Sequence, residues 1–173
     1  MKTPFPPFDG GVSSGLLDST GCCPSKHYLA PGRLYASADR VCVTTILGSC
    51  VAVCLYDPDH QVGGINHFLL PFGVPASPRF GDAAVPLLIE NVLAKGAHRP
   101  TLRAKLFGGA CVLEAFRSQD PLGAQNVRVA RERLQAEHIP IVAEDTGGDH
   151  GRKLLFELHT GDAWVRAIET REP

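Results

Sequence analysis

Residues 44–71, TTILGSCVAVCLYDPDHQVGGINHFLLP, bring two cysteines, two histidines and two threonines together in one apolar segment. Side chains of these types support three kinds of role. They bind structural zinc, they act as a cysteine nucleophile with a histidine base, or they pack as ordinary core residues. The spacing of these residues, and the elements that carry them, distinguish the three roles.

A zinc site fits the spacing poorly. Structural zinc needs two pairs of Cys or His ligands at short spacing. Here Cys50 and Cys54 form one pair, and only the scattered His60 and His67 follow. On a strand, Cys50 and Cys54 would share a face but lie about 13 Å apart, because each residue advances the chain by about 3.3 Å. We therefore expect no metal site.

A catalytic cysteine fits the segment better. Cys50 follows Gly48 and Ser49, two small residues that allow a tight turn and a close approach of the backbone to a substrate. Backbone amides of such a turn can stabilise an oxyanion, so Gly48 and Ser49 are candidate oxyanion and substrate residues. From spacing alone, a buried core cysteine remains the competing interpretation.

His67 is the candidate base for Cys50. It lies beyond the Gly63-Gly64 pair, in a second apolar run, and a hairpin between the two runs would bring it within reach of Cys50. A neighbouring imidazole activates a thiol, and the imidazole itself needs a third group to fix its orientation. The hydroxyl of either Thr44 or Thr45 could supply that contact.

Composition narrows the class of protein. The chain has 173 residues, 44% hydrophobic and 20% charged, with a net charge of −1. Near-neutral charge argues against nucleic acid as the main partner. No apolar run reaches the roughly 18 residues needed to span a membrane, and the first residues have no apolar signal region. These features predict a cytoplasmic protein, whose six cysteines would be reduced.

The elements that must position the site follow from the rest of the chain. Residues 1–32 are rich in Pro, Gly and Ser and predict a mobile extension, followed by one domain over residues 33–173. Short β-branched runs predict strands. Periodic apolar residues predict helices within 81–97 and 126–138, and alternating runs around Thr160-Gly161-Asp162 predict a hairpin. The order predicts a single layered α+β domain with a mixed or antiparallel β core.

Two further features allow more than one interpretation. The pairs Gly108-Gly109 and Gly147-Gly148 predict tight turns, either as plain backbone geometry or as substrate contacts. Arg152 is a candidate contact for an acidic substrate or partner, or else a surface ion-pair partner of Asp149 or Glu157.

The sequence resembles the CheD family of chemoreceptor glutamine deamidases. The resemblance is carried by LGSCVAVCLYD at 47–57, GGINHFLLP at 63–71, RFGDAAVPLLIENVLAKGA at 79–97, AKLFGGA at 104–110 and GGDHGRKLLFELHTGDAWV at 147–165. These blocks follow in order through most of the chain after the N-terminal extension. The fold implied is that of CheD proteins and deamidating bacterial toxins.

This resemblance implies a cysteine, histidine and threonine site. Cys50 matches the nucleophile, His67 the general base, and Thr44, six residues before the cysteine, the residue that orients the imidazole. Cys54 matches no reactive position. The implied reaction converts a chemoreceptor glutamine to glutamate through a thioester, without metal or organic cofactor.

The implied partners are chemoreceptor cytoplasmic helices as protein substrate and a chemotaxis phosphatase of the CheC type. Two rival functions share these features. One is a regulatory module that binds the CheC-type phosphatase without turnover, and the other is a cysteine peptidase or receptor methylesterase, since a thioester route also cleaves other amides and esters.

Overall fold

The computed structural model describes residues 25–112 and 120–168, which form strands, two α-helices and one 3₁₀ helix. In chain order the elements are β1 (Ser25–Tyr28), β2 (Arg33–Ser37), β3 (Val41–Leu47), β4 (Val51–Asp57), β5 (Val62–His67), α1 (Gly81–Ala94), η1 (Arg99–Thr101), β6 (Arg103–Gly108), α2 (Leu122–Ala136), β7 (Ile141–Thr146), β8 (Arg152–Glu157) and β9 (Ala163–Ala167).

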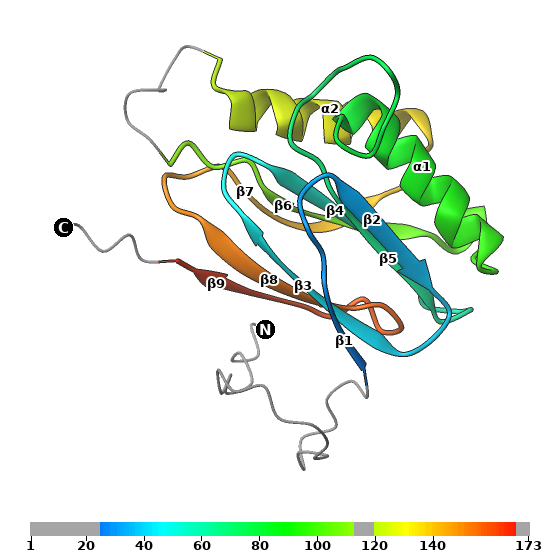
Figure 1. Cartoon of the computed structure of the whole chain (residues 1–173). Coiled ribbons are helices and arrows are strands. Elements are labelled where there is room, and N and C mark those ends of the chain that lie inside the picture. The colour runs from blue at the N-terminus through cyan, green and yellow to red at the C-terminus, as the bar shows by residue number, and fades with distance from the viewer. Residues whose placement is uncertain (1–24, 113–119, 169–173) are drawn as a thin grey trace.

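The strands form two sheets, and the helices cover one of them (Figure 1). The first sheet has the order β1-β3-β8-β9, and the second has the order β2-β5-β4-β6-β7. Helices α1 and α2 pack on the outer face of the second sheet. The described residues therefore form three layers, and the α+β class predicted from the sequence is confirmed.

Two apolar cores hold the layers together. Val43, Leu47, Cys54, Ile65 and Phe156 belong to the core between the two sheets. The second core joins the helices to the outer face of the second sheet and includes Val51, Val53, Leu55, Leu88 and Leu134. Strand β4 contributes alternate residues to the two cores, because successive side chains of a strand point to opposite faces. Its run of buried residues follows from this central position.

The hairpin and helix predictions are confirmed, but the boundary predicted at residue 33 is wrong. Strands β8 and β9 pair antiparallel on either side of residues 158–162, and α1 and α2 overlap both predicted helices. However, β1 pairs in parallel with β3, and Leu29 is buried. Composition did not reveal β1, because this strand is stabilised by pairing with β3, a contact that the local sequence does not show. The remainder of the predicted extension lies outside the described residues.

The cysteines also differ from expectation. Cys50, Cys54 and Cys111 are free thiols, as predicted. Cys42 is disulfide-bonded. The expectation that all six cysteines are reduced, which was drawn from the predicted cytoplasmic location, is therefore wrong for Cys42.

Candidate active site

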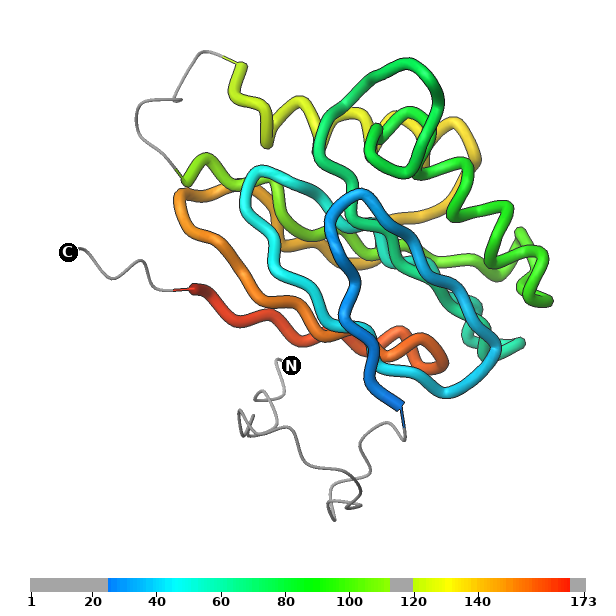
Figure 2. Tube along the Cα trace, in the orientation of Figure 1, coloured from blue at the N-terminus to red at the C-terminus, as the bar shows by residue number. Residues whose placement is uncertain are grey.

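Cys50 lies where the chain passes from one sheet to the other. Strand β3 ends at Leu47 in the first sheet and β4 begins at Val51 in the second, so residues 48–50 form the crossover (Figure 2). Cys50 is half-buried and packs against the core between the sheets. The small residues Gly48 and Ser49 permit this abrupt change of sheet.

The predicted hairpin brings His67 beside Cys50. Strands β4 and β5 pair antiparallel, and the pairs Cys54–Ile65 and Val51–Phe68 share one register. This register places His67 opposite Ala52 and makes Cys50 its diagonal neighbour on the same face. Diagonal neighbours in an antiparallel pair lie about 7–8 Å apart and are within reach of long side chains.

Thr45 anchors the His67 ring from the opposite sheet. The Thr45 hydroxyl oxygen lies 2.8 Å from His67 Nδ1 and 2.8 Å from the carbonyl oxygen of Leu29. A hydroxyl has one proton, and the carbonyl can only accept, so Thr45 donates to Leu29. His67 Nδ1 must then carry a proton and donate it to Thr45. This hydrogen-bond set assigns the tautomer in which His67 Nε2 bears the lone pair.

This geometry corrects the prediction for Thr44. The Thr44 hydroxyl donates to the Leu154 carbonyl at 3.0 Å, within the first sheet. Side chains alternate along β3, so Val43, Thr45 and Leu47 face the second sheet while Thr44 faces away. The residues alone left Thr44 and Thr45 open, and the resemblance to CheD favoured Thr44, whereas the period-two pattern around Val43 and Leu47 favours Thr45.

Cys50 and His67 are both neutral near pH 7. Burial lowers the pKa of His67 to about 4, and the ring is only 1% exposed. Burial also raises the pKa of the Cys50 thiol, although its own backbone N–H opposes this rise. His67 Nε2 is buried and has no hydrogen-bond partner. Cys50 is therefore a protonated thiol, and His67 is a neutral imidazole whose Nε2 lone pair is unpartnered.

The crossover is fixed by hydrogen bonds to three successive carbonyl groups. The carbonyl of Gly48 accepts from the Ala110 N–H at 2.8 Å, and that of Cys50 accepts from the Gly109 N–H at 2.8 Å. The carbonyl of Ser49 accepts from the Asn126 side chain at 2.9 Å.

A trans peptide directs its N–H opposite to its C=O. The N–H groups of Ser49 and Cys50 therefore point away from the protein groups that hold these carbonyls. That orientation is the one an oxyanion site at this turn requires.

The two glycine pairs form turns that pack against the backbone of the crossover and against each other: the Gly109 N–H donates to the Cys50 carbonyl, and the Gly147 N–H donates to the Gly108 carbonyl. Gly108 has φ +105°, and a Cβ there would lie 2.2 Å from the Cys50 carbonyl oxygen.

Arg152 is buried, and its guanidinium donates to the carbonyls of Gly108, Asp145 and Gly147 at 2.6–2.8 Å. Both surface roles predicted for Arg152 are therefore wrong. Glu157, one of its predicted partners, pairs with Arg40 instead.

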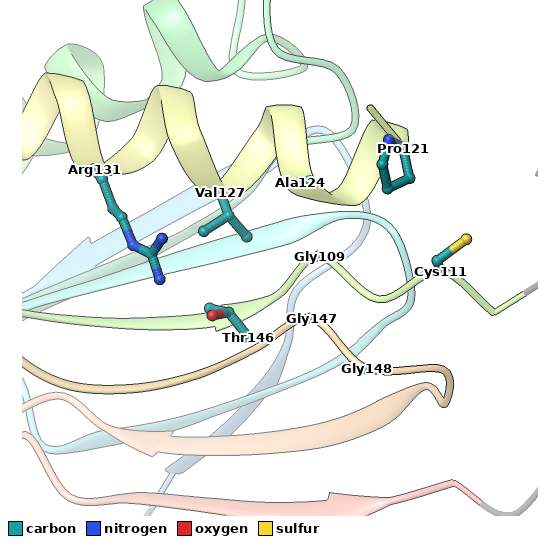
Figure 3. Close-up of a pocket in the computed structure, with 9 residues that line it drawn as sticks. All are labelled: Gly109, Cys111, Pro121, Ala124, Val127, Arg131, Thr146, Gly147 and Gly148. Carbon is teal, nitrogen blue, oxygen red and sulfur yellow. The ribbon is translucent and has the colours of Figure 1, made fainter. Parts of the chain in front are cut away.

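A pocket of about 290 Å³ lies on the α2 side of the Gly109 turn (Figure 3). Figure 3 shows Arg131 and Thr146 facing the space between α2 and the strand ends, with Cys111 near the turn. Cys50 and His67 do not line this pocket, and Arg131 is held by a bidentate pair with Glu144. Over residues 25–112 and 120–168, no three His, Cys, Asp or Glu side chains form a metal site.

Sequence reasoning missed Asn126 and gave Arg152 the wrong role. Asn126 lies on the buried face of α2 together with Ala130 and Leu134, and a polar residue within that apolar stripe was the available signal. Arg152 was noticed as a charged residue, but its actual partners, three backbone carbonyls and the Asp145 carboxylate at 3.7 Å, are brought together by the fold.

Comparison with known proteins gives the family. The family described as "CheD chemotactic sensory transduction" matches residues 73–167. The chain is also 50% identical over 146 residues to the "Probable chemoreceptor glutamine deamidase CheD 1" of Anaeromyxobacter dehalogenans (strain 2CP-C). That match covers 83% of this chain and 85% of the relative. The chain belongs to the CheD family.

Other CheD proteins match over a similar length. Those of Stenotrophomonas maltophilia (strain K279a) and Xanthomonas euvesicatoria pv. vesicatoria (strain 85-10) are each 48% identical over 143 residues, covering 81% of this chain and 72% of the relative. Both carry the name "Probable chemoreceptor glutamine deamidase CheD". The resemblance to CheD seen in the sequence is confirmed. Because the family match begins after His67, the assignment of Cys50 and His67 depends on the geometry described above.

No helix among the described residues has the length and apolar character needed to cross a membrane.

Proposed function

We propose that this protein is a chemoreceptor glutamine deamidase that uses Cys50 as nucleophile, His67 as base and Thr45 as the residue that orients the imidazole. One observation carries the proposal. The Nδ1 of His67 is held by Thr45 while Nε2 is unpartnered, on the strand face that Cys50 shares. This is the arrangement of an oriented base awaiting a proton. The names of the CheD relatives supply the substrate class.

The first half of the reaction forms a thioester. The Cys50 sulfur attacks the side-chain carbonyl carbon of a receptor glutamine while its proton passes to His67 Nε2. The N–H groups of Ser49 and Cys50, in the Gly48-Ser49 turn, would stabilise the oxyanion. The carbon–nitrogen bond then breaks, and His67 returns the proton to the departing ammonia.

The second half restores the enzyme. His67 Nε2 takes a proton from water, and the resulting hydroxide attacks the thioester carbonyl. The carbon–sulfur bond breaks, the sulfur recovers its proton from His67, and glutamate is released. The overall change is glutamine plus water to glutamate plus ammonia. It balances without a metal or organic cofactor.

The same proposal includes the location and the partners. The substrate glutamines lie on the cytoplasmic helices of a chemoreceptor, so the reaction takes place in the cytoplasm. Cys50 is half-buried rather than enclosed, which suits a side chain presented by a large protein surface. A CheC-type phosphatase is the second partner, and it would bind as a regulator of turnover.

Mass spectrometry of a receptor cytoplasmic fragment incubated with the protein tests this function. We expect glutamine-to-glutamate conversion and ammonia release, both absent with Cys50→Ala. Loss of a methyl group from methylated glutamates would instead identify a methylesterase, and backbone cleavage would identify a peptidase. Binding of a CheC-type phosphatase with no chemical change in the receptor would identify the regulatory module.

A further inference from the structure

Asn126 connects α2 to both segments that carry the reactive pair. Its side chain is completely buried, and its Nδ2 donates to the carbonyl oxygens of Ser49 and Leu69, each at 2.9 Å. Ser49 directly precedes Cys50, and Leu69 follows His67 by two residues. One amide group therefore holds the crossover and the end of the β5 segment in a fixed relation.

The orientation of this amide is unambiguous. Both Nδ2 hydrogens go to carbonyl oxygens, and a flipped amide would place Oδ1 against those same oxygens. This orientation leaves Asn126 Oδ1 buried without a hydrogen-bond partner, which is unfavourable. By contrast, both polar groups of the buried Asn66 amide have partners: its Oδ1 accepts from the Val53 N–H, and its Nδ2 donates to the Ala84 carbonyl.

The Ser49 contact controls an amide at the reaction centre. The Ser49 carbonyl and the Cys50 N–H belong to one planar trans peptide group. When Asn126 draws the carbonyl inward, the Cys50 N–H must point the opposite way. Without that hydrogen bond, rotation of this peptide would turn the N–H from the position where the oxyanion forms.

We propose that Asn126 is a positioning residue that aims the Cys50 N–H at the developing oxyanion and holds Cys50 and His67 in register. The oxyanion part rests on the proposed deamidase function. The positioning of the Cys50 peptide does not, because it is measurable on the chain without substrate. Asn126 touches neither the substrate nor the reacting sulfur in this scheme.

The first test measures the pH dependence of Cys50 alkylation by iodoacetamide, followed by peptide mapping. The Cys50 N–H favours the thiolate, so misdirecting it raises the pKa of the thiol. We expect the midpoint to move to higher pH in Asn126→Asp and in Asn126→Ala. Gln125→Ala is the control on the adjacent, half-buried residue, whose side chain donates to the Asp120 carbonyl and does not contact the crossover. Leu134→Ala controls for a loss of stability in the same helix.

The second test separates kcat from KM in receptor deamidation. Removal of one oxyanion donor lowers kcat by about 10²- to 10³-fold, and misdirection of a donor should lower it by about 10- to 100-fold with little change in KM. If the wild type alkylates as expected but does not deamidate, the proposed function fails while the alkylation test of Asn126 still stands.

Folded Asn126 variants with unchanged alkylation midpoints would overturn the proposal. An equal shift in Leu134→Ala would do the same, because it would assign the effect to general loosening of α2. If no Asn126 variant folds, Asn126 is a structural residue and the proposal is also overturned.

Discussion

Thr45→Val tests the site most directly, because it preserves the shape of the side chain and removes one hydroxyl. The change leaves the buried Leu29 carbonyl and His67 Nδ1 without partners. Each unsatisfied buried group costs about 1–3 kcal/mol, so for these two groups the free energy of unfolding should fall by about 2–6 kcal/mol. The imidazole proton is then no longer held on Nδ1, and its transfer to Nε2 would remove the base.

The rate effect of Thr45→Val should be smaller than that of removing the imidazole. Positioned acid–base catalysis accelerates a reaction by about 10²- to 10⁴-fold. Loss of the imidazole orientation removes only part of this acceleration and should lower the deamidation rate by about 10- to 100-fold. Thr44→Val is the matched control. It loses one hydrogen bond to the Leu154 carbonyl, worth about 1 kcal/mol, and should leave the rate nearly unchanged.

Single-turnover deamidation rates and thermal unfolding of the Thr44, Thr45 and His67→Ala variants decide between the two threonines. The reasoning is refuted if Thr44→Val slows the reaction while Thr45→Val is silent. Two silent threonine variants would remove the orienting role altogether.

Three further outcomes follow from the structure. Because burial lowers the pKa of His67 from 6.5 to about 4, the base stays neutral and kcat/KM should fall only below about pH 4–5; a fall already centred near pH 6.5 would contradict this. The same shift means that the unfolded chain binds the His67 proton more readily, so this residue reduces stability as pH falls from 6.5 to 4. Cys50→Ala should fold and lose turnover, whereas Cys54→Ala should keep turnover and lose about 1–3 kcal/mol from its buried site, as urea unfolding would show; inactive, fully stable Cys54→Ala would reverse the assignment. Deletion of residues 1–32 removes β1 and should lower stability by about 3 kcal/mol more than deletion of residues 1–24, and equal melting temperatures would show that β1 contributes nothing.

Local sequence patterns predicted the part of the site that one hairpin assembles. Cys50 directly precedes β4 and His67 ends β5, the antiparallel partner of β4, so the turn between the two strands and the period of two were sufficient to bring them to one face. The third residue depends on which face of β3 meets the other sheet. Here the resemblance to CheD favoured Thr44, although the apolar neighbours of Thr45 were visible in the sequence.

Contacts between distant segments could not be predicted in this way. Asn126 is 77 residues from Ser49, and the local sequence around either residue does not indicate that the two are in contact. Strand β1 was missed for the same reason, because its sequence is polar and its order comes from pairing with β3. The layered α+β class was predictable because it depends only on the order and periodicity of the elements.

The passage of the chain between sheets at Cys50 has a consequence for how this protein loses function. Thr45 belongs to one sheet and His67 to the other, so neither sheet alone contains a working site. A slight separation of the two sheets would break the Thr45–His67 contact while most backbone pairing within each sheet persists. Deamidation rate should then report on closure of the sandwich and decline in mild urea before the circular dichroism of the strands does. Turnover would serve as a sensitive probe of how firmly the two sheets stay together.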